Sequence, residues 1–203
     1  MPFPAALLFL QPNRLDLLAN QYLGTVKRTQ YSHHRDIRAD EGLFLCDCSE
    51  WVGFLLEKGF PEALSEIPIS DGKIRQRAVD FCNYFRHLSA PSANWSRVWK
   101  VSFVQPGDVI AWDLPKGAKD TGHVMIARRP PSENRDGSFS INVSDSSALL
   151  HDEDSRARGS GGGVGTGTIT LLVDTNGAPV GFKFRAKNSA HLSVIGIARL
   201  RGS

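Results

Sequence analysis

The chain has few cysteines, little net charge and no long apolar run. Three of its 203 residues are cysteine, which is too few for a disulfide framework. Cys46 and Cys48 are separated by one residue and are poorly placed to bond each other. A formal net charge of +3 is too small to indicate nucleic-acid binding. Since no stretch reaches the ~20 apolar residues of a membrane span, we expect neither a nucleic-acid partner nor a membrane span.

The N-terminal segment, residues 1–18, carries a short apolar run without the features of a secretory leader. It lacks a basic start and contains two early prolines, so it is a poor signal peptide as it stands. The compartment is therefore left open: periplasmic or secreted if a leader has been removed, and cytoplasmic otherwise.

The remaining sequence has an ordinary globular composition, with 41% hydrophobic and 22% charged residues. We expect a single domain over residues 1–203, and a monomer, because this length supports one sizeable core and no linker is evident. Helical spacing predicts helices over 13–23, 47–58 and 72–88. Short β-branched segments between turn residues predict strands over 107–113, 122–128, 138–145, 168–174, 179–185 and 193–200. Helices followed by a run of strands indicate an α+β fold with an antiparallel sheet.

Cys48 stands where a helix should begin. Asp47 precedes it and can cap the helix, and Val52, Leu55 and Leu56 follow on one apolar face. The unpaired backbone N–H groups of a first turn favour the thiolate over the thiol. The position therefore indicates a nucleophile, whereas Cys46 and Cys82 lie in apolar surroundings typical of core residues.

A thiolate nucleophile needs a base, and the base needs an orienting partner. His123 opens one predicted strand and Asp145 ends the next. If the hairpin between them is symmetric about Asn134, Ala127 faces Ile141 and His123 faces Asp145. Opposed side chains have Cβ atoms about 4.5–5.5 Å apart, so a carboxylate beside the imidazole is expected.

These segments, in this order, resemble the NlpC-type cysteine peptidases, which belong to the papain-like superfamily of bacterial cell-wall hydrolases and are related to the CHAP amidases. The resemblance covers roughly residues 30–147 and is specific as an ordered set. Its matching pieces are DCSEWV at 47–52, QPGDVIAW at 105–112, GHVMIA at 122–127 and SINVSDSS at 140–147.

The resemblance implies a papain-like NlpC-type fold with N-terminal helices packed on the sheet. It implies Cys48 as nucleophile, His123 as base, Asp145 as the third polar residue and Tyr31 as a substrate-binding residue. Two positions depart from the family pattern. Glu50 stands where glycine is usual and could border the substrate. Asp145 stands where many cell-wall members have histidine, and its charge should raise the pKa of the imidazole.

Several residues have a simpler interpretation. His33 and His151 are expected at the surface, His151 in a solvated loop, and residues 156–167 as a mobile glycine-rich loop. A metal site built on Cys46 and Cys48 lacks the usual ligand spacing, so no metal or other cofactor is expected.

We interpret the chain as a cysteine peptidase or amidase that cleaves an amide or isopeptide bond by a Cys48–His123–Asp145 triad. The expected substrate is a peptidoglycan stem peptide or another peptide. Two alternatives remain: an acyltransferase on the same fold, and a non-catalytic binding module with a residual triad.

Overall fold

A computed structural model describes residues 14–114, 120–157 and 159–202. The apolar N-terminal run, except for its last residues, lies outside the described part of the chain. Within the described residues, no helix is both long and apolar enough to cross a membrane.

The helices gather in the first half of the chain. Their bounds are α1 Arg14–Leu23, α2 Cys48–Gly59, α3 Pro61–Ser65 and α4 Ala78–His87, with short 3-10 turns at Ala39–Glu41 and Val101–Phe103. The predicted helices over 13–23 and 47–58 are confirmed to within a residue at the ends that the structure describes.

The strands form two sheets. The first strands are β1 Arg28–Tyr31, β2 Asp36–Arg38, β3 Leu43–Cys46 and β4 Trp95–Arg97. The others are β5 Val109–Asp113, β6 Gly122–Ala127, β7 Ser132–Glu133, β8 Phe139–Ser147, β9 Gly163–Val173, β10 Pro179–Lys183, β11 His191–Leu192 and β12 Ile195–Leu200. Each of the six predicted strands is present.

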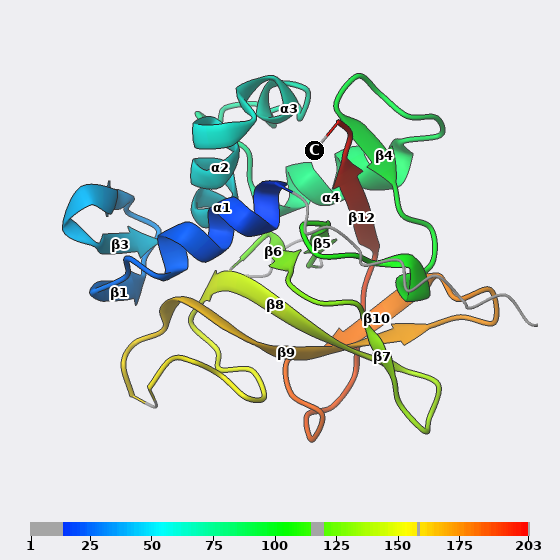
Figure 1. The fold of residues 1–203 in the computed structure, drawn as a ribbon. Coiled ribbons are helices and arrows are strands. Elements are labelled where there is room, and N and C mark those ends of the chain that lie inside the picture. Colours follow the sequence, from blue (N-terminus) through cyan, green and yellow to red (C-terminus); the bar gives the residue numbers. More distant parts are fainter. Residues whose placement is uncertain (1–13, 115–119, 158, 203) are drawn as a thin grey trace, which may run out of the picture.

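The larger sheet is antiparallel throughout and forms the body of the molecule. Its order is β11-β10-β9-β8-β6-β5-β12-β4, with β7 paired to β8. Helices α2 and α4 contact one face of it, α2 against β6 and β8 and α4 against β5, β6 and β12. Figure 1 shows the helices on one side and the long β8–β9 hairpin running beneath them. The predicted α+β fold, with helices packed on an antiparallel sheet, is confirmed.

Alternate residues of the central strands enter two different cores. Val124 and Ile126 of β6 join the helices in one apolar cluster, whereas Met125 and Ala127 join a second cluster on the opposite face. Strands β10 and β12 contact each other although four strands separate them in the sheet order. The sheet therefore curls around the second cluster, and both of its faces are buried near β6.

The predicted helix over 72–88 is wrong in its first turn and a half. Helix α4 begins only at Ala78, where the Asp80 carboxylate accepts a hydrogen bond from the backbone N–H of Arg77 at 2.8 Å. Ile74, which a helix over 72–88 would place on the same face as Ala78, is 96% exposed. Gly72 has a φ of +71°, and the following segment carries Arg75 to the start of α2, where its charge finds two carboxylates.

The predicted register of the β6–β8 hairpin is also wrong, by two residues. Ala127 pairs with Val143 rather than Ile141. The tight turn lies past Asn134, where the backbone N–H of Gly137 donates to the Asn134 carbonyl at 3.0 Å and Gly137 has a φ of +79°. A shift of two leaves every side chain on its predicted face, so Asp145 stays on the same side of the sheet as His123.

Candidate active site

Helix α2 presents Cys48 in a capped first turn. Cys48 is the first residue of the helix, and Asp47 accepts a hydrogen bond from the backbone N–H of Glu50 at 2.9 Å. The Glu50 carboxylate accepts in return from the backbone N–H of Asp47, also at 2.9 Å. These reciprocal bonds are a capping box. The predicted cap by Asp47 is confirmed, and it fixes the direction in which the helix start presents the thiol.

Arg75, which lies outside the helix, stabilises this cap by binding its side chains. Its guanidinium donates to Asp47 at 2.8 Å and to the Ser49 hydroxyl at 2.7 Å, and lies 3.2 Å from Glu50. Burial would raise the pKa of Asp47, but the Glu50 N–H and the charge of Arg75 hold that pKa below its usual value. Burial leaves the pKa of Glu50 above its usual value. Arg75 thus neutralises two carboxylates that the fold has drawn beside Cys48.

Glu50 does not border the cavity as its substrate-binding assignment anticipates. Its side chain is buried, and its carboxylate is taken up by the cap and by Arg75. Asp47 and Arg75 do line the cavity described below. An effect of Glu50 on a bound molecule would therefore be transmitted through these two neighbours.

His123 and Asp145 are in direct contact beneath the thiol. The Nε2 atom of His123 lies 2.5 Å from an Asp145 carboxylate oxygen. Burial alone would lower the pKa of His123. The charge of Cys48, together with hydrogen bonds to Asp145 and to the Cys48 side chain, raises it instead to about 9. The structure therefore brings together the three residues of the predicted triad.

Asp145 has two further partners that sequence reasoning missed. His151 Nε2 lies 2.8 Å from the oxygen that contacts His123, and an Arg156 nitrogen lies 3.0 Å from the other oxygen. Asp145 is fully buried. Burial opposes ionisation, but the two histidines and Arg156 hold the pKa of Asp145 well below its usual range. The carboxylate is thus an anion fixed in one orientation.

The surface loop predicted for His151 is wrong, because its side chain is completely buried. The nearby glycine-rich segment is not a mobile loop over 163–167 either, since those residues belong to β9. A Cβ on Gly165 would lie 2.7 Å from the Arg156 side chain, and one on Gly167 would lie 2.6 Å from that of His151. The alternating glycines make room for the two partners of Asp145, and this spacing was the available sequence signal.

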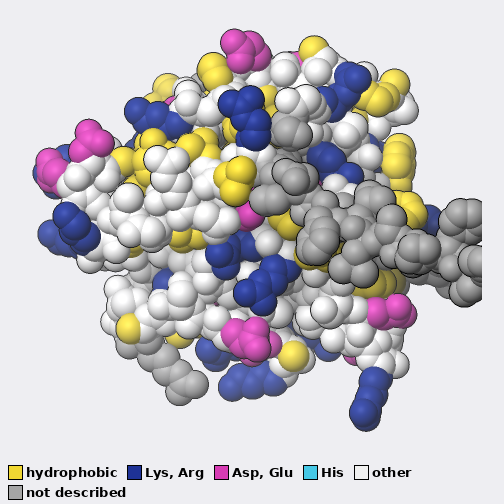
Figure 2. Space-filling view, viewed as in Figure 1, with side chains coloured by type: hydrophobic (Ala, Val, Ile, Leu, Met, Phe, Trp, Pro, Cys, Tyr) yellow, Lys and Arg dark blue, Asp and Glu magenta, His cyan; other side chains and the backbone are white. Residues whose placement is uncertain are grey.

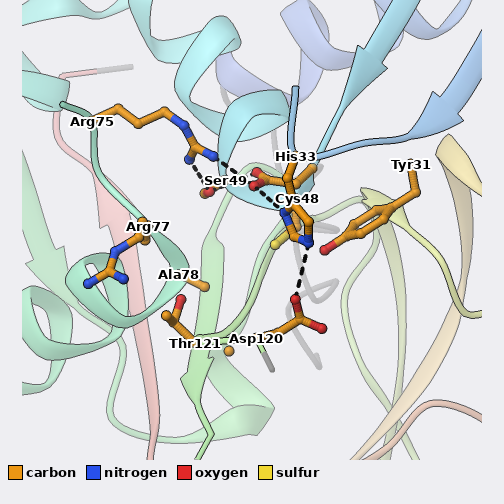
Figure 3. A pocket seen from close by; sticks show the side chains of 11 residues that line it. Tyr31, His33, Cys48, Ser49, Arg75, Arg77, Ala78, Asp120 and Thr121 are labelled. Atoms are coloured by element: carbon orange, nitrogen blue, oxygen red, sulfur yellow. Dashed lines mark hydrogen bonds and ion pairs between the residues drawn. The ribbon is translucent and has the colours of Figure 1, made fainter. Parts of the chain in front are cut away.

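A cavity of about 220 Å³ opens over Cys48. Figure 3 shows Tyr31 and His33 on one side of it and Arg75 and Arg77 on the other. The Tyr31 hydroxyl points into the cavity, and burial, followed by the charge of Cys48, raises the pKa of that hydroxyl. The structure thus brings Tyr31, the predicted substrate-binding residue, to the mouth of the site.

His33 is a third residue of the site that sequence reasoning missed. It was expected at the surface without a partner, and it is half exposed, but its ring nitrogens lie 3.3 Å from Asp47 and 3.3 Å from Asp120. Its ring also meets that of Tyr31 edge-on, with centroids 5.3 Å apart. His33 therefore ties the helix cap to the segment that precedes β6.

Among the described residues, one group has the composition of a metal site: His123, Asp145 and His151, whose ligand atoms lie within 4.8 Å of one another. Both imidazoles point their Nε2 atoms at a single carboxylate oxygen at hydrogen-bond distance, and Arg156 occupies the other oxygen. This arrangement uses the nitrogens as donors, so we assign the group to hydrogen bonding.

No known family model matches the chain. The chain is 29% identical over 125 residues to the uncharacterised protein R653 of Acanthamoeba polyphaga mimivirus, covering 54% of this chain and about half, 53%, of that protein. It also resembles the crystal structure of the wild-type endolysin LysIME-EF1, with a TM-score of 0.43 and 15% identity, covering 91% of this chain and 63% of that chain. At this level of similarity, the chemistry of the site has to be argued from its own residues.

Proposed function

We propose that this protein is a cysteine hydrolase of NlpC type, which cleaves an amide or isopeptide bond in a peptide such as a peptidoglycan stem peptide. The observation that carries the proposal is the convergence of Cys48, at a capped helix start, with a buried His123 whose second nitrogen contacts Asp145 at 2.5 Å. Structural cysteines need no such partners. A nucleophile, a base and an orienting carboxylate are the parts of thiol acyl transfer.

His123 is hydrogen-bonded to the Cys48 side chain, and the reactive form of the pair has the proton on His123 and a thiolate on Cys48. The thiolate attacks the carbonyl carbon, and the developing oxyanion is stabilised by the backbone N–H of Cys48 at the helix start. His123 then donates its proton to the leaving nitrogen as the C–N bond breaks, which leaves a thioester on Cys48. Water attacks the thioester and gives a proton to His123, and the thiolate departs. Asp145 stabilises the imidazolium in every step at which it is charged.

The test of substrate class is incubation with purified peptidoglycan, followed by mass spectrometry of the released fragments. We expect new amino groups on stem-peptide fragments with the wild type and none with Cys48→Ala. Release of sugar fragments alone, or equal release by the variant, would contradict the proposal.

A parallel measurement separates an enzyme from a binding module with a residual triad. Iodoacetamide at neutral pH should alkylate Cys48, which lines the cavity, faster than Cys46 and Cys82, which line neither cavity and whose pKa values burial raises to about 12 and about 11. Peptide mapping gives the site of modification. Equal, slow alkylation of all three cysteines would favour the binding module.

A further inference from the structure

A second cavity lies beside His123. It measures about 120 Å³ and is enclosed mainly by apolar side chains: Trp112, Leu114, Leu149, Phe182 and Phe184. Binding pockets for drug-sized molecules run to about 300–1,000 Å³, so this cavity suits a single side chain rather than a cofactor. Most of its lining is apolar, whereas the cavity over Cys48 is lined by Asp47, Arg75 and Arg77.

Aromatic rings shape the interior of this cavity. The Trp112 and Phe182 rings stack with centroids 3.9 Å apart at 17°, and both are buried. The Phe184 ring meets each of them edge-on, at 5.8 and 5.3 Å. Since Trp112 comes from β5 and the other two from β10 and the residue after it, the curled sheet itself fixes the wall.

An exposed leucine stands at the rim. Leu149 is 55% exposed, and its backbone is held by the Ser147 hydroxyl, which donates to the Leu149 carbonyl at 2.8 Å and accepts from its N–H at 3.1 Å. A large apolar side chain that the fold secures in water beside an aromatic pocket is available to cover a bound apolar group.

The two cavities are adjacent and share part of their lining. Tyr31, Asp120 and Gly122 line both of them, Cys48 lines only the polar one, and His123 lines only the apolar one. In thiol catalysis the histidine protonates the departing nitrogen. The part of the substrate attached to that nitrogen therefore lies on the His123 side of the thiol.

We propose that the apolar cavity is the subsite for the residue on the amine side of the scissile bond, and that it takes a substrate with an apolar side chain there. The inference rests on the proposed function, because it uses the role of His123. The acyl side of the substrate then lies in the polar cavity, near Arg75 and Arg77. The substrate class is a peptide cut before a residue such as leucine or phenylalanine.

The first experiment is cleavage of a synthetic peptide library by the wild type, by Leu149→Asp and by Leu192→Asp. Leu192 is an exposed leucine on β11 that does not line the cavity, so its variant is the matched control. We expect wild-type cleavage before leucine and phenylalanine to exceed cleavage before glycine by about 10-fold or more, the order that apolar pockets provide. Leu149→Asp should lose most of this preference, and Leu192→Asp should keep it. Cleavage without preference, or an equal loss in both variants, overturns the subsite.

The second experiment measures binding in the apolar cavity without requiring substrate turnover. Alkylation of Cys48 by chloroacetamide and by its N-benzyl derivative is followed by intact mass in the same three proteins. We expect the benzyl probe to be favoured in the wild type and in Leu192→Asp but not in Leu149→Asp. If Leu149→Asp removes the benzyl preference but no library peptide is cleaved, the apolar cavity stands as a binding site and the proposed hydrolase function is overturned. An unchanged ratio of the two rates in Leu149→Asp overturns the cavity.

Discussion

Cys48 and Cys82 are both buried, but only Cys48 lines a cavity, so substitution of each should have a different outcome. Cys48→Ala should abolish turnover with little change in the free energy of unfolding, because the thiol, although only 4% exposed, already borders a cavity and its removal opens no new one. Cys82→Ala should retain activity but lower the free energy of unfolding by about 1–3 kcal/mol, because its side chain lies in the core under α4. Urea unfolding with a peptidoglycan cleavage assay measures both. Activity in purified Cys48→Ala would remove the nucleophile assignment.

His151 should act on the site through Asp145. His151→Gln can still offer an N–H donor to the carboxylate, whereas His151→Phe keeps the ring, which stacks on Phe184 with centroids 5.7 Å apart, but has no donor. When residue 151 no longer donates a hydrogen bond, the Asp145 carboxylate interacts more strongly with His123. We therefore expect the pKa of His123 to rise in His151→Phe and to stay near its wild-type value in His151→Gln. Imidazole NMR titration measures that pKa, and equal values in the two variants would show that His151 has only a packing role.

At the scale of single residues, the sequence predicted the residues whose side-chain type is unusual at that place in a helix or strand. Cys48 at a helix start, and a histidine and an aspartate on paired strands, are informative in themselves. His151 and Arg156 are not, because polar residues among Asp, Glu, Ser and Gly are usually solvated. Their burial depends on Gly165 and Gly167, which lie at least nine residues further along the chain. A local sequence pattern does not predict contacts over that separation.

Among the elements, strand β9 makes room for the buried polar network by having no side chain at two of its positions. Gly165→Ala would place a methyl group 2.7 Å from Arg156, whose guanidinium is held by Asp145 and by Asp154. We expect a loss of about 1–3 kcal/mol in unfolding free energy from overpacking, together with slower alkylation of Cys48.

Gly53→Ala is the matched control. Gly53 lies inside α2, and a Cβ there meets nothing within 4 Å, so alanine should stabilise the helix by up to about 1 kcal/mol. Chemical denaturation of both variants tests the pair. Equal, small effects would mean that Arg156 can shift away from Gly165 at little cost.

The elements that sequence missed are short or polar. Strands β1, β2 and β3 have three or four residues each, and β1 and β2 lie half exposed with no apolar alternation. The first residues of the predicted third helix have helical spacing, but the contacts of Arg75 with Asp47 and Glu50 outweigh one more turn of helix. Long-range ion pairs of this kind have no signature within a local window of sequence.

At the scale of the whole molecule, 24 lysines and arginines nearly balance 21 aspartates and glutamates, and both signs are interspersed on the face that Figure 2 shows. Such a surface produces no strong field of one sign. The pH dependence of activity should therefore follow the buried groups beneath the cavity rather than the overall charge.

The falling limb of the pH profile should report His123. Its pKa is raised to about 9, so the imidazolium that protonates the leaving nitrogen is present at lower pH and is lost as the pH rises through that value. We expect kcat/KM for a cleaved peptide to fall above about pH 9. In Asp145→Asn the negative charge that supports the imidazolium is gone, so the limb should move to lower pH and turnover should drop strongly. A wild-type limb near the ordinary histidine value of about 6.5 would contradict this account.

His123, His151 and Arg156 all bind Asp145, and this limits which segments can be exchanged between this chain and an NlpC-type peptidase. The histidine that the resemblance leads one to expect at this position could not simply be exchanged into this scaffold. It would place a third imidazole against His123 and His151 and leave Arg156 facing it with one carboxylate partner, Asp154. The end of β8 and the loop that carries His151 and Arg156 must therefore be exchanged together. A chimera that takes only one of these two segments from another protein should express poorly, even though each segment is a native sequence.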